Sequence, residues 1–575
     1  MQTKSINIAF IFLVFLFSCS NDFLTKHPLG VVERESLKSK AGIEALIIAA
    51  YSSLNPQHTS WGSNPCNWVY GSVVGGDAYK GSEAGDQPDI NSIERYACQT
   101  NNGYTNEKWN WAYNGIFRCN DAISILSETT IGGDIDETFI KTKKGELRFL
   151  RGFYFFELIR MFGPKVPWLD ETIIDQNINN PKIPNDKDIT SNIQADFQFA
   201  ADNLPETWDE IGRVNCWAAK AMLAKHLLYQ HKYADAKFYF DDIIANGKTT
   251  KGDKYALLPS FEMNFNIAYE NSSESIFAIQ NDIGDGSRKH GNAGYSLCYP
   301  YGSDAPGGCC GFFQPSQSLV NSFKVDASGL PLLDSFNQIN FANDDGLESK
   351  DKYIPDTTTA IDPRLDWSVG RRGIPYLDWG LHPGKNWIRD QNYGGPYSPI
   401  KNVYRKVDPS EKNDWWAPGS ALNFDLIRFA DVLLMAAECE VEVGSLHQAT
   451  EYVNRVRNRA KSSNLVKFAN GTPSANYVVE PYSIDFADKI IAGKAVRFER
   501  KIELAMEGHR FFDLSRWGIT IVKAEIDAYI AKEGVRHTQF QGAKFDVPCD
   551  LNYPIPVQQI ELSQGILIQN GSTCN

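Results

Sequence analysis

The sequence lacks the features of an integral membrane protein and of a nucleic-acid-binding protein. After the first twenty residues, no apolar stretch approaches the roughly 20 residues needed to span a bilayer. There is no long basic run, and 70 acidic residues outnumber 57 basic ones, which gives a formal net charge of −13. Because nucleic-acid binding requires a clustered basic surface, we expect no nucleic-acid partner and membrane attachment only through an N-terminal anchor.

Cysteine motifs for zinc or redox chemistry are also missing. None of the 11 cysteines belongs to a CxxC pair. Cys216 and Cys439 lie in apolar helical runs, where a buried thiol is the ordinary outcome, and we predict no disulfide pairing. For the adjacent Cys309 and Cys310, in a Gly-rich loop, we expect two loop thiols or links to different partners rather than a redox switch.

The motifs of common catalytic classes are absent as well. There is no Gly-x-Ser-x-Gly, no HExxH and no phosphate-binding loop, and the nine histidines are scattered. The stretch 281–286 resembles a calcium-binding turn but lacks alternating ligands and a terminal glutamate. We therefore expect no enzyme activity, no cofactor and no metal site.

One row of carboxylates invites a catalytic interpretation. Glu499, Glu503 and Glu507 recur at four-residue steps, which places them on one face of a helix. Two carboxylates held close together can hydrolyse glycosides. Four arginines surround them in the sequence: Arg497, Arg500, Arg510 and Arg516. Arginines favour ionised carboxylates, whereas a general acid needs the opposite environment. We expect a structural network of ion pairs.

The N-terminus has the pattern of a bacterial lipoprotein signal. Lys4 precedes an apolar run of about twelve residues, which ends in Leu16, Phe17, Ser18 and Cys19. A small residue directly before a cysteine indicates that Cys19 receives the lipid. We predict a signal peptide over 1–18 and a polar tether over 19–36. A secretory signal with a chance cysteine and a transmembrane helix are the alternatives.

The mature chain is predicted to be mainly α-helical. Apolar residues recur at three- and four-residue steps from Ile43 to Leu54. The stretch 146–162 is apolar nearly all round, which predicts a buried helix that ends at Gly163-Pro164. We predict helical regions over 37–261 and 421–575.

Two segments have the length of tetratricopeptide hairpins, which predicts a tetratricopeptide-like scaffold. The first covers 214–246. The second has an apolar helix over 424–443, Gly444 in a left-handed turn, and a new helix capped by Ser445 with Gln448 three residues later.

Between these regions, 262–420 is rich in glycine, proline and scattered aromatics, which predicts a large loop-rich insertion with little β structure. Loops on a rigid scaffold often carry binding residues. Sugars stack on aromatic rings and bond planar polar groups, so we looked for loop aromatics beside such groups. The candidates fall into three clusters: Trp61, Trp68, Tyr70, Asp77 and Tyr79; Arg288, Tyr295, Tyr299 and Tyr301; Trp379 and Trp387, close to Arg389.

Several separated segments resemble one family. They are Trp109 with Tyr113 and Asn120, 146–152, Phe162-Gly163, Val166-Pro167, Asp362-Pro363-Arg364, 427–434, 497–518, Pro554-Ile555-Pro556 and Gln569-Asn570. The chain thereby resembles the SusD/RagB proteins, surface lipoproteins that partner TonB-dependent SusC-like transporters in Bacteroidetes. The resemblance covers nearly the whole mature chain.

The resemblance implies a SusD-like helical scaffold, glycan binding at a loop-rich face, and delivery of the glycan to a SusC-like transporter at the outer membrane. The protein would be anchored by its lipid, facing the cell exterior. Capture of peptides or glycopeptides, as in relatives that resemble RagB, is the alternative. The residues after Cys19 are Ser-Asn-Asp rather than a run of acids, so anchoring that faces the periplasm stays open.

Overall fold

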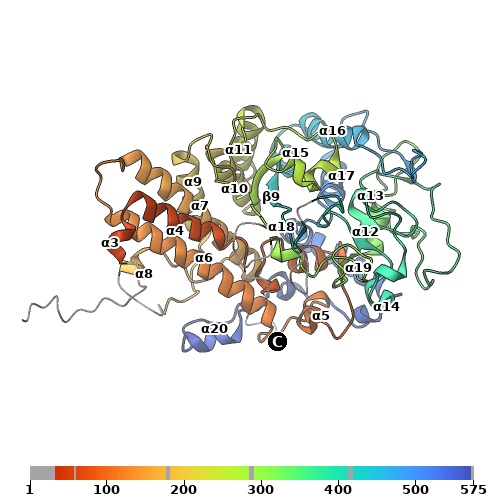
Figure 1. The fold of residues 1–575 in the computed structure, drawn as a ribbon, viewed down its shortest axis with the longest axis horizontal. Helices are drawn as coiled ribbons and strands as arrows, with labels where there is room; N and C mark the ends of the chain where they lie inside the picture. Colours follow the sequence, from red (N-terminus) through yellow and green to blue (C-terminus); the bar gives the residue numbers. More distant parts are fainter. Residues whose placement is uncertain are drawn as a thin grey trace, which may run out of the picture.

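The computed structural model describes residues 33–56, 60–175, 182–283, 291–408, 411–412 and 419–571 (Figure 1). The predicted signal peptide, Cys19 and most of the predicted tether lie outside these residues. Helices provide most of the regular structure, and the strands form only two-stranded sheets in the part described. The predicted mainly α fold with little β structure is confirmed. No helix among the described residues is long and apolar enough to cross a membrane.

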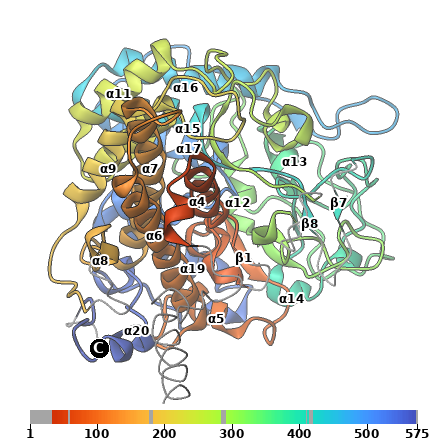
Figure 2. The same cartoon turned by 60° about the vertical axis from the view of Figure 1, so that its left-hand side comes forward.

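Two long helices dominate the N-terminal region. α6 (Gly103–Glu128) and α7 (Glu137–Phe162) run side by side, and α4 (Lys40–Ser52) packs against both (Figure 2). α7 contains the predicted buried helix and ends, as predicted, at Gly163, which has a φ of +84°. The smaller elements here are α3 (Arg34–Leu37), η2 (Trp61–Ser63), η3 (Trp68–Val73), β1 (Ala78–Gly81), α5 (Pro88–Glu94), α8 (Thr172–Asp175) and α9 (Thr190–Asn203).

Both predicted helical hairpins are present and pack together. The first is α10 (Cys216–Tyr229) with α11 (Tyr233–Asn246), and the second is α15 (Phe429–Val443) with α16 (Leu446–Ser462). α11 contacts α15, so the hairpins form one continuous helical layer. The remaining C-terminal elements are β10 (Asn476–Tyr477), α17 (Lys489–Glu503), α18 (Arg510–Arg516), α19 (Ile519–Glu533), η8 (Thr538–Phe540), η9 (Cys549–Leu551) and α20 (Val557–Leu562).

The turn between α15 and α16 confirms one detail and corrects another. The Ser445 side chain accepts a hydrogen bond from the Gln448 N–H, as the predicted cap requires. Gly444 has a φ of −120°, so the prediction of a left-handed residue there was wrong. The Gly444 N–H bonds the Glu440 carbonyl, which ends the helix without a left-handed turn.

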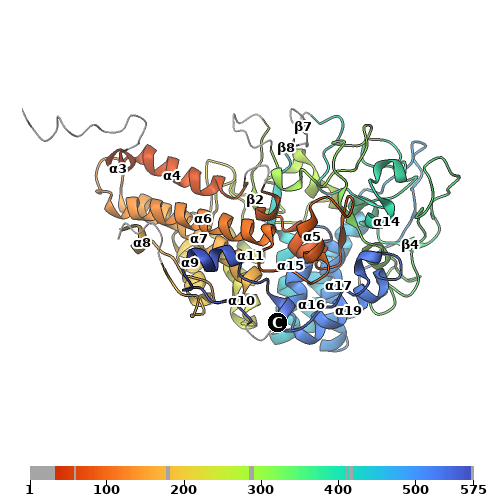
Figure 3. The same cartoon turned by 90° about the horizontal axis from the view of Figure 1, so that it is seen from below.

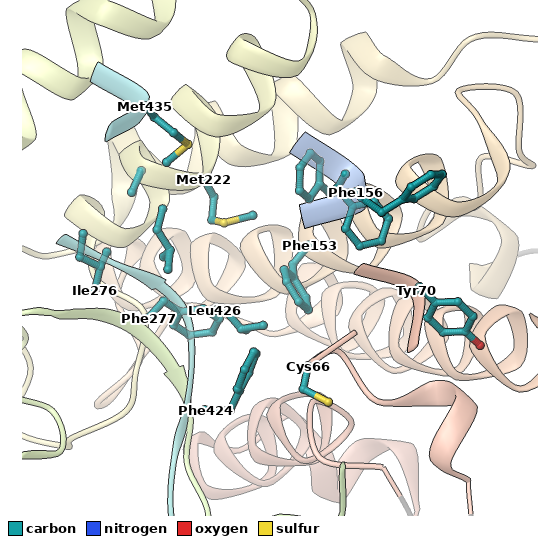
Figure 4. Packing of buried hydrophobic residues seen from close by; sticks show 14 of the residues in the cluster. Cys66, Tyr70, Phe153, Phe156, Met222, Ile276, Phe277, Phe424, Leu426 and Met435 are labelled. Atoms are coloured by element: carbon teal, nitrogen blue, oxygen red, sulfur yellow. The ribbon is translucent and has the colours of Figure 1, made fainter. Parts of the chain in front are cut away.

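The predicted start of the second hairpin was also wrong, because β9 (Phe424–Arg428) is a strand and not the first turns of a helix. It pairs antiparallel with β2 (Ser275–Ile279), about 150 residues earlier in the chain. Figure 4 shows Phe424 and Leu426 of β9 beside Cys66, Phe153 and Met222 in the main core. The apolar side chains of this segment are therefore buried by a sheet partner that local periodicity does not reveal.

The predicted loop-rich insertion is present. In Figure 3 the loops around β7, β8 and α14 lie on one side of the layer that contains α9, α10 and α16. A second, smaller core holds these loops together through Tyr299, Tyr376, Trp387 and Tyr404. Besides β2, the regular elements of the loop-rich insertion are η4 (Phe261–Phe265), η5 (Ile267–Tyr269), η6 (Ala293–Tyr295), β3 (Phe312–Pro315), α12 (Gln317–Ser322), β4 (Ala360–Ile361), α13 (Leu365–Ser368), β5 (Val369–Gly370), η7 (Lys385–Trp387), α14 (Gln391–Gly394), β6 (Ser398–Pro399), β7 (Glu411–Lys412) and β8 (Gly419–Ser420).

The prediction of no disulfide pairing was wrong. Cys309 and Cys310 form a disulfide with each other, and Cys549 is also disulfide-bonded. The two thiols of Cys309 and Cys310 are neighbours in a loop and bond each other, whereas Cys216 and Cys439 lie singly in two different helices. Cys216 and Cys439 are buried free thiols, as expected.

Candidate functional site

Most members of the first predicted cluster are buried and serve the core. Trp68 packs against Phe313 with ring centroids 5.6 Å apart, and the Tyr70 hydroxyl lies within hydrogen-bond distance of the Gly62 and Tyr104 carbonyl oxygens, at 2.9 and 2.8 Å. Tyr79 and Asp77 are also buried. These four side chains are buried in this structure, and their role in glycan binding stays a prediction.

The same cluster holds one less buried residue. Trp61 is half-buried, and its indole N–H donates to the Ser296 hydroxyl at 3.0 Å.

The second cluster contains the most exposed candidate. Tyr295 and Tyr299 are buried, whereas 39% of the Tyr301 surface is exposed. Arg288 lies outside the described residues.

The third cluster is largely the core of the loop region. Trp387 is buried against Tyr376, with ring centroids 5.3 Å apart. Trp379 is half-buried, and its indole N–H donates to the Tyr404 carbonyl at 3.1 Å. Tyr295, Tyr299 and Trp387 therefore contribute to packing in this structure, and their role in glycan binding stays a prediction.

The structure nevertheless brings parts of all three clusters together. β1 pairs antiparallel with β3, and the Ser82 N–H bonds the Gly311 carbonyl just beyond that pair. The turn after β1 thereby meets the segment of Tyr301. The Tyr301 N–H in turn donates to the Trp387 carbonyl at 2.9 Å. This bond holds the loop before α14 against the segment of Tyr301.

Four side chains form what we call the Tyr301 surface: Tyr301, Arg389, Glu83 and Asp86. The Arg389 guanidinium lies 5.4 Å from the centre of the Tyr301 ring. It pairs with Glu83 at 2.8 Å and also with Asp86, and all four side chains are partly exposed. A ring face beside planar charged groups is the combination that sugars bind.

Gly311 makes this close arrangement possible. Its φ is +77°, and a Cβ there would lie 3.3 Å from the Tyr301 Cβ and 3.4 Å from the Arg389 Cβ. A side chain at this position would be strained and would push the ring and the guanidinium apart. The disulfide of Cys309 and Cys310 directly precedes it.

Glu83 and Asp86 were missed from the sequence. The available signal was their Gly-rich turn, Gly81 to Asp86, directly after a cluster already chosen for its polar and aromatic residues. What the sequence did not show is that β1 pairs with β3 and places this turn beside Tyr301.

The carboxylate row forms a buried ion network, as predicted. Glu503 bonds Arg364 at 2.8 Å and Arg428 at 2.6 Å, and Glu499 pairs with Arg457 at 2.9 Å. The partners are distant in sequence rather than the neighbouring arginines that we had expected.

The chemistry of this network opposes general acid catalysis. Burial alone would raise the pKa of Glu503, but the charges of Arg459, Arg428 and Arg364 hold it well below its ordinary value. A general acid must keep its proton near neutral pH. Within the described ranges, no group of three His, Cys, Asp or Glu side chains is arranged to hold a metal ion.

Comparison with known families gives two matches that together span almost all of the described chain. A model of the SusD family matches residues 273–571. A second model, described as starch-binding associating with outer membrane, matches residues 22–228.

Curated relatives match along most of their length. The SusD-like protein P25 of Formosa agariphila is 25% identical over 593 aligned residues, which cover 99% of this chain and 98% of the relative. A SusD-like protein of Bacteroides ovatus is 24% identical, covering 90% and 83%.

Solved structures share the fold. A SusD superfamily protein from Bacteroides vulgatus superposes with a TM-score of 0.68 at 22% identity, covering 93% of this chain and 99% of that one. The surface glycan-binding protein A of Bacteroides thetaiotaomicron, solved in complex with laminarihexaose, gives a TM-score of 0.63 at 20% identity, covering 92% and 99%.

Proposed function

This chain belongs to the SusD family, and from that membership we propose that it is a non-enzymatic protein that captures glycans and delivers them to a SusC-like TonB-dependent transporter. A lipid on Cys19 would hold it at the outer membrane, facing the cell exterior. One family model carries a description that names starch binding and the outer membrane, which supports glycan capture and a location at the outer membrane. Mass spectrometry of the mature N-terminus checks the lipid, and an unmodified Cys19 would contradict it.

The Tyr301 surface is the observation that carries the proposed binding. It is the place where a partly exposed ring from the predicted clusters lies beside a guanidinium and two carboxylates. Sugar C–H groups would stack on the ring while hydroxyl groups bond Arg389, Glu83 or Asp86. The pairing of Arg389 with Glu83 and Asp86 holds the guanidinium over the ring before any ligand arrives.

Absence of catalysis is supported by the same structure. The carboxylates that could resemble a glycosidase pair are buried and ion-paired, and the exposed Glu83 and Asp86 are both paired with Arg389. In both sets the carboxylates have arginine partners, whereas a glycosidase needs a protonated carboxyl group opposite a second carboxylate.

The test is binding of a polysaccharide panel that includes laminarin, measured by calorimetry on the soluble mature chain. Tyr301→Ala removes the ring and is expected to weaken binding of the preferred glycan about 5- to 150-fold, since stacking of a nucleic-acid base on an aromatic ring contributes about 1–3 kcal/mol and we expect a similar contribution for a sugar. Tyr269→Ala is the matched control, because Tyr269 is also 39% exposed but lies in η5.

Equal binding by Tyr301→Ala and the parent would remove the Tyr301 surface from the proposal. Copurification of peptides with a preparation that binds no glycan would favour peptide capture instead.

A further inference from the structure

A cavity lies apart from the Tyr301 surface and shares no residue with it. It has a volume of about 250 Å³ and lies between α17, α18, α19 and the segment of Leu333 and Phe336. Figure 3 shows α17 and α19 on the side of the molecule opposite β7 and β8. A single water needs only about 10–15 Å³ of such space, so the cavity has room for a group much larger than a simple ion.

The walls of this cavity carry more positive than negative charge. Four basic side chains line it, Lys494, Arg497, Lys501 and Arg510, against two acidic ones, Asp334 and Glu525. The difference, four minus two, leaves two positive charges in excess. In a protein whose formal net charge is −13, this is a local reversal of sign.

The ion pairs show which cations are unmatched. Lys494 pairs with Asp334 at 2.8 Å, and Arg510 pairs with Glu525 at 3.0 Å. Arg497 and Lys501 have neither a hydrogen bond nor a carboxylate within 4.0 Å among the residues that the structure describes.

Aromatic rings hold the unmatched cations in place. The Lys501 ammonium lies 4.1 Å from the centre of the Phe336 ring, and the Arg497 guanidinium lies 5.8 Å from that of Trp517. Contacts of this kind orient a cation but leave its hydrogen-bond donors free for another group.

Two further observations show that these cations lie in a buried, positively charged environment. Arg510 is 7% exposed, and its buried Nε–H has no acceptor in the part of the chain that the structure describes, although the guanidinium is paired through another nitrogen. Burial, together with the positive charge of Arg510, lowers the pKa of Lys501 to about 8. An anion in the cavity, between Arg497 and Lys501, would offset the excess positive charge.

We propose that this cavity binds the carboxylate or sulfate ester of an acidic sugar unit. Arg497 and Lys501 would contact the anion, while Phe336, Phe498 and Trp517 form apolar walls for the carbon atoms of the sugar. The choice of a sugar rests on the proposed glycan function, and the choice of an anion rests on the charges of the cavity itself.

The experiment uses the soluble mature chain and four compounds: glucuronate, glucose 6-sulfate, glucose and inorganic sulfate. Calorimetry is expected to detect both acidic sugars but not glucose. Arg497→Gln and Lys501→Met are each expected to weaken the acidic sugars about tenfold, because a hydrogen bond to a charged group is lost. Lys523→Gln is the control, since Lys523 is an exposed residue of α19 paired with Asp527 and outside the cavity.

Binding of neither acidic sugar, equal binding of glucose, or unchanged affinity in both variants would overturn the proposal. Inorganic sulfate that binds as tightly as glucose 6-sulfate would overturn the assignment to a sugar. Neutral polysaccharides tested on the same samples report on the Tyr301 surface, so failure of one site is distinguishable from failure of the other. Thermal unfolding of each variant identifies any that fails to fold, and the second variant then decides.

Discussion

At the scale of single residues, one network of buried charges in this protein is centred on Glu503. Its carboxylate accepts hydrogen bonds from Arg364, Arg428 and Arg459, and all four side chains are almost fully buried. These arginines come from the loop region, from β9 and from α16, so a single carboxylate joins three separate segments to the end of α17.

Glu503→Gln keeps the shape of the side chain but removes the charge that compensates the three guanidinium groups. Breaking a buried pair by neutralising one partner typically costs about 3–5 kcal/mol. We therefore expect the free energy of unfolding, measured in urea, to fall by about this amount. Glu480→Gln is the matched control: Glu480 pairs with Lys461 at the surface, where such pairs contribute about 0–1 kcal/mol. Equal losses in the two variants would contradict a network centred on Glu503.

The aromatic residues show where prediction from the sequence reached its limit at this scale. Tyr299, Tyr301 and Trp387 all lie in Gly-rich stretches, and nothing local distinguishes them. Tyr299 and Trp387 are buried in the small loop core, whereas Tyr301 is partly exposed beside Arg389. Exposure depends on which other loops lie on top, and that is a property of contacts between segments far apart in the sequence.

At the scale of elements, features specified by nearby residues were predicted well. The end of α7 at Gly163 and the start of α16 at Ser445 depend on backbone conformation and capping within four residues. β9 was predicted as a helix because its apolar residues continue into α15 without a break, and its partner β2 is about 150 residues away. The Tyr301 surface depends on pairing of the same kind, between β1 and β3, which is why the sequence supplied its members but not their arrangement.

At the scale of the whole molecule, the N-terminal and C-terminal regions meet with almost no space between their backbones. Gly508 follows α17 and has a φ of +76°, and its N–H donates to the Ser72 hydroxyl of η3 at 3.0 Å. A Cβ on Gly508 would lie 2.0 Å from the Cys66 carbonyl oxygen, and one on Gly71 would lie 1.8 Å from the Gly508 carbonyl oxygen. One hydrophobic cluster extends through both regions, from Ile43 to Leu567. The close approach at Gly508 and Gly71 therefore joins two regions that share one core.

Gly508→Ala should therefore weaken the attachment of the two regions and not only strain one turn. We expect the free energy of unfolding to fall by roughly 2–5 kcal/mol, because the cost of a positive φ, about 1–2 kcal/mol, adds to that of overpacking, about 1–3 kcal/mol. Gly542→Ala separates the two costs: Gly542 also has a φ of +76°, and a Cβ on it would have no neighbouring atom within 4 Å, so only the backbone cost applies. Urea unfolding of both variants measures the difference, and a loss no greater for Gly508→Ala than for Gly542→Ala would show that the Cβ added at Gly508 is accommodated at little cost.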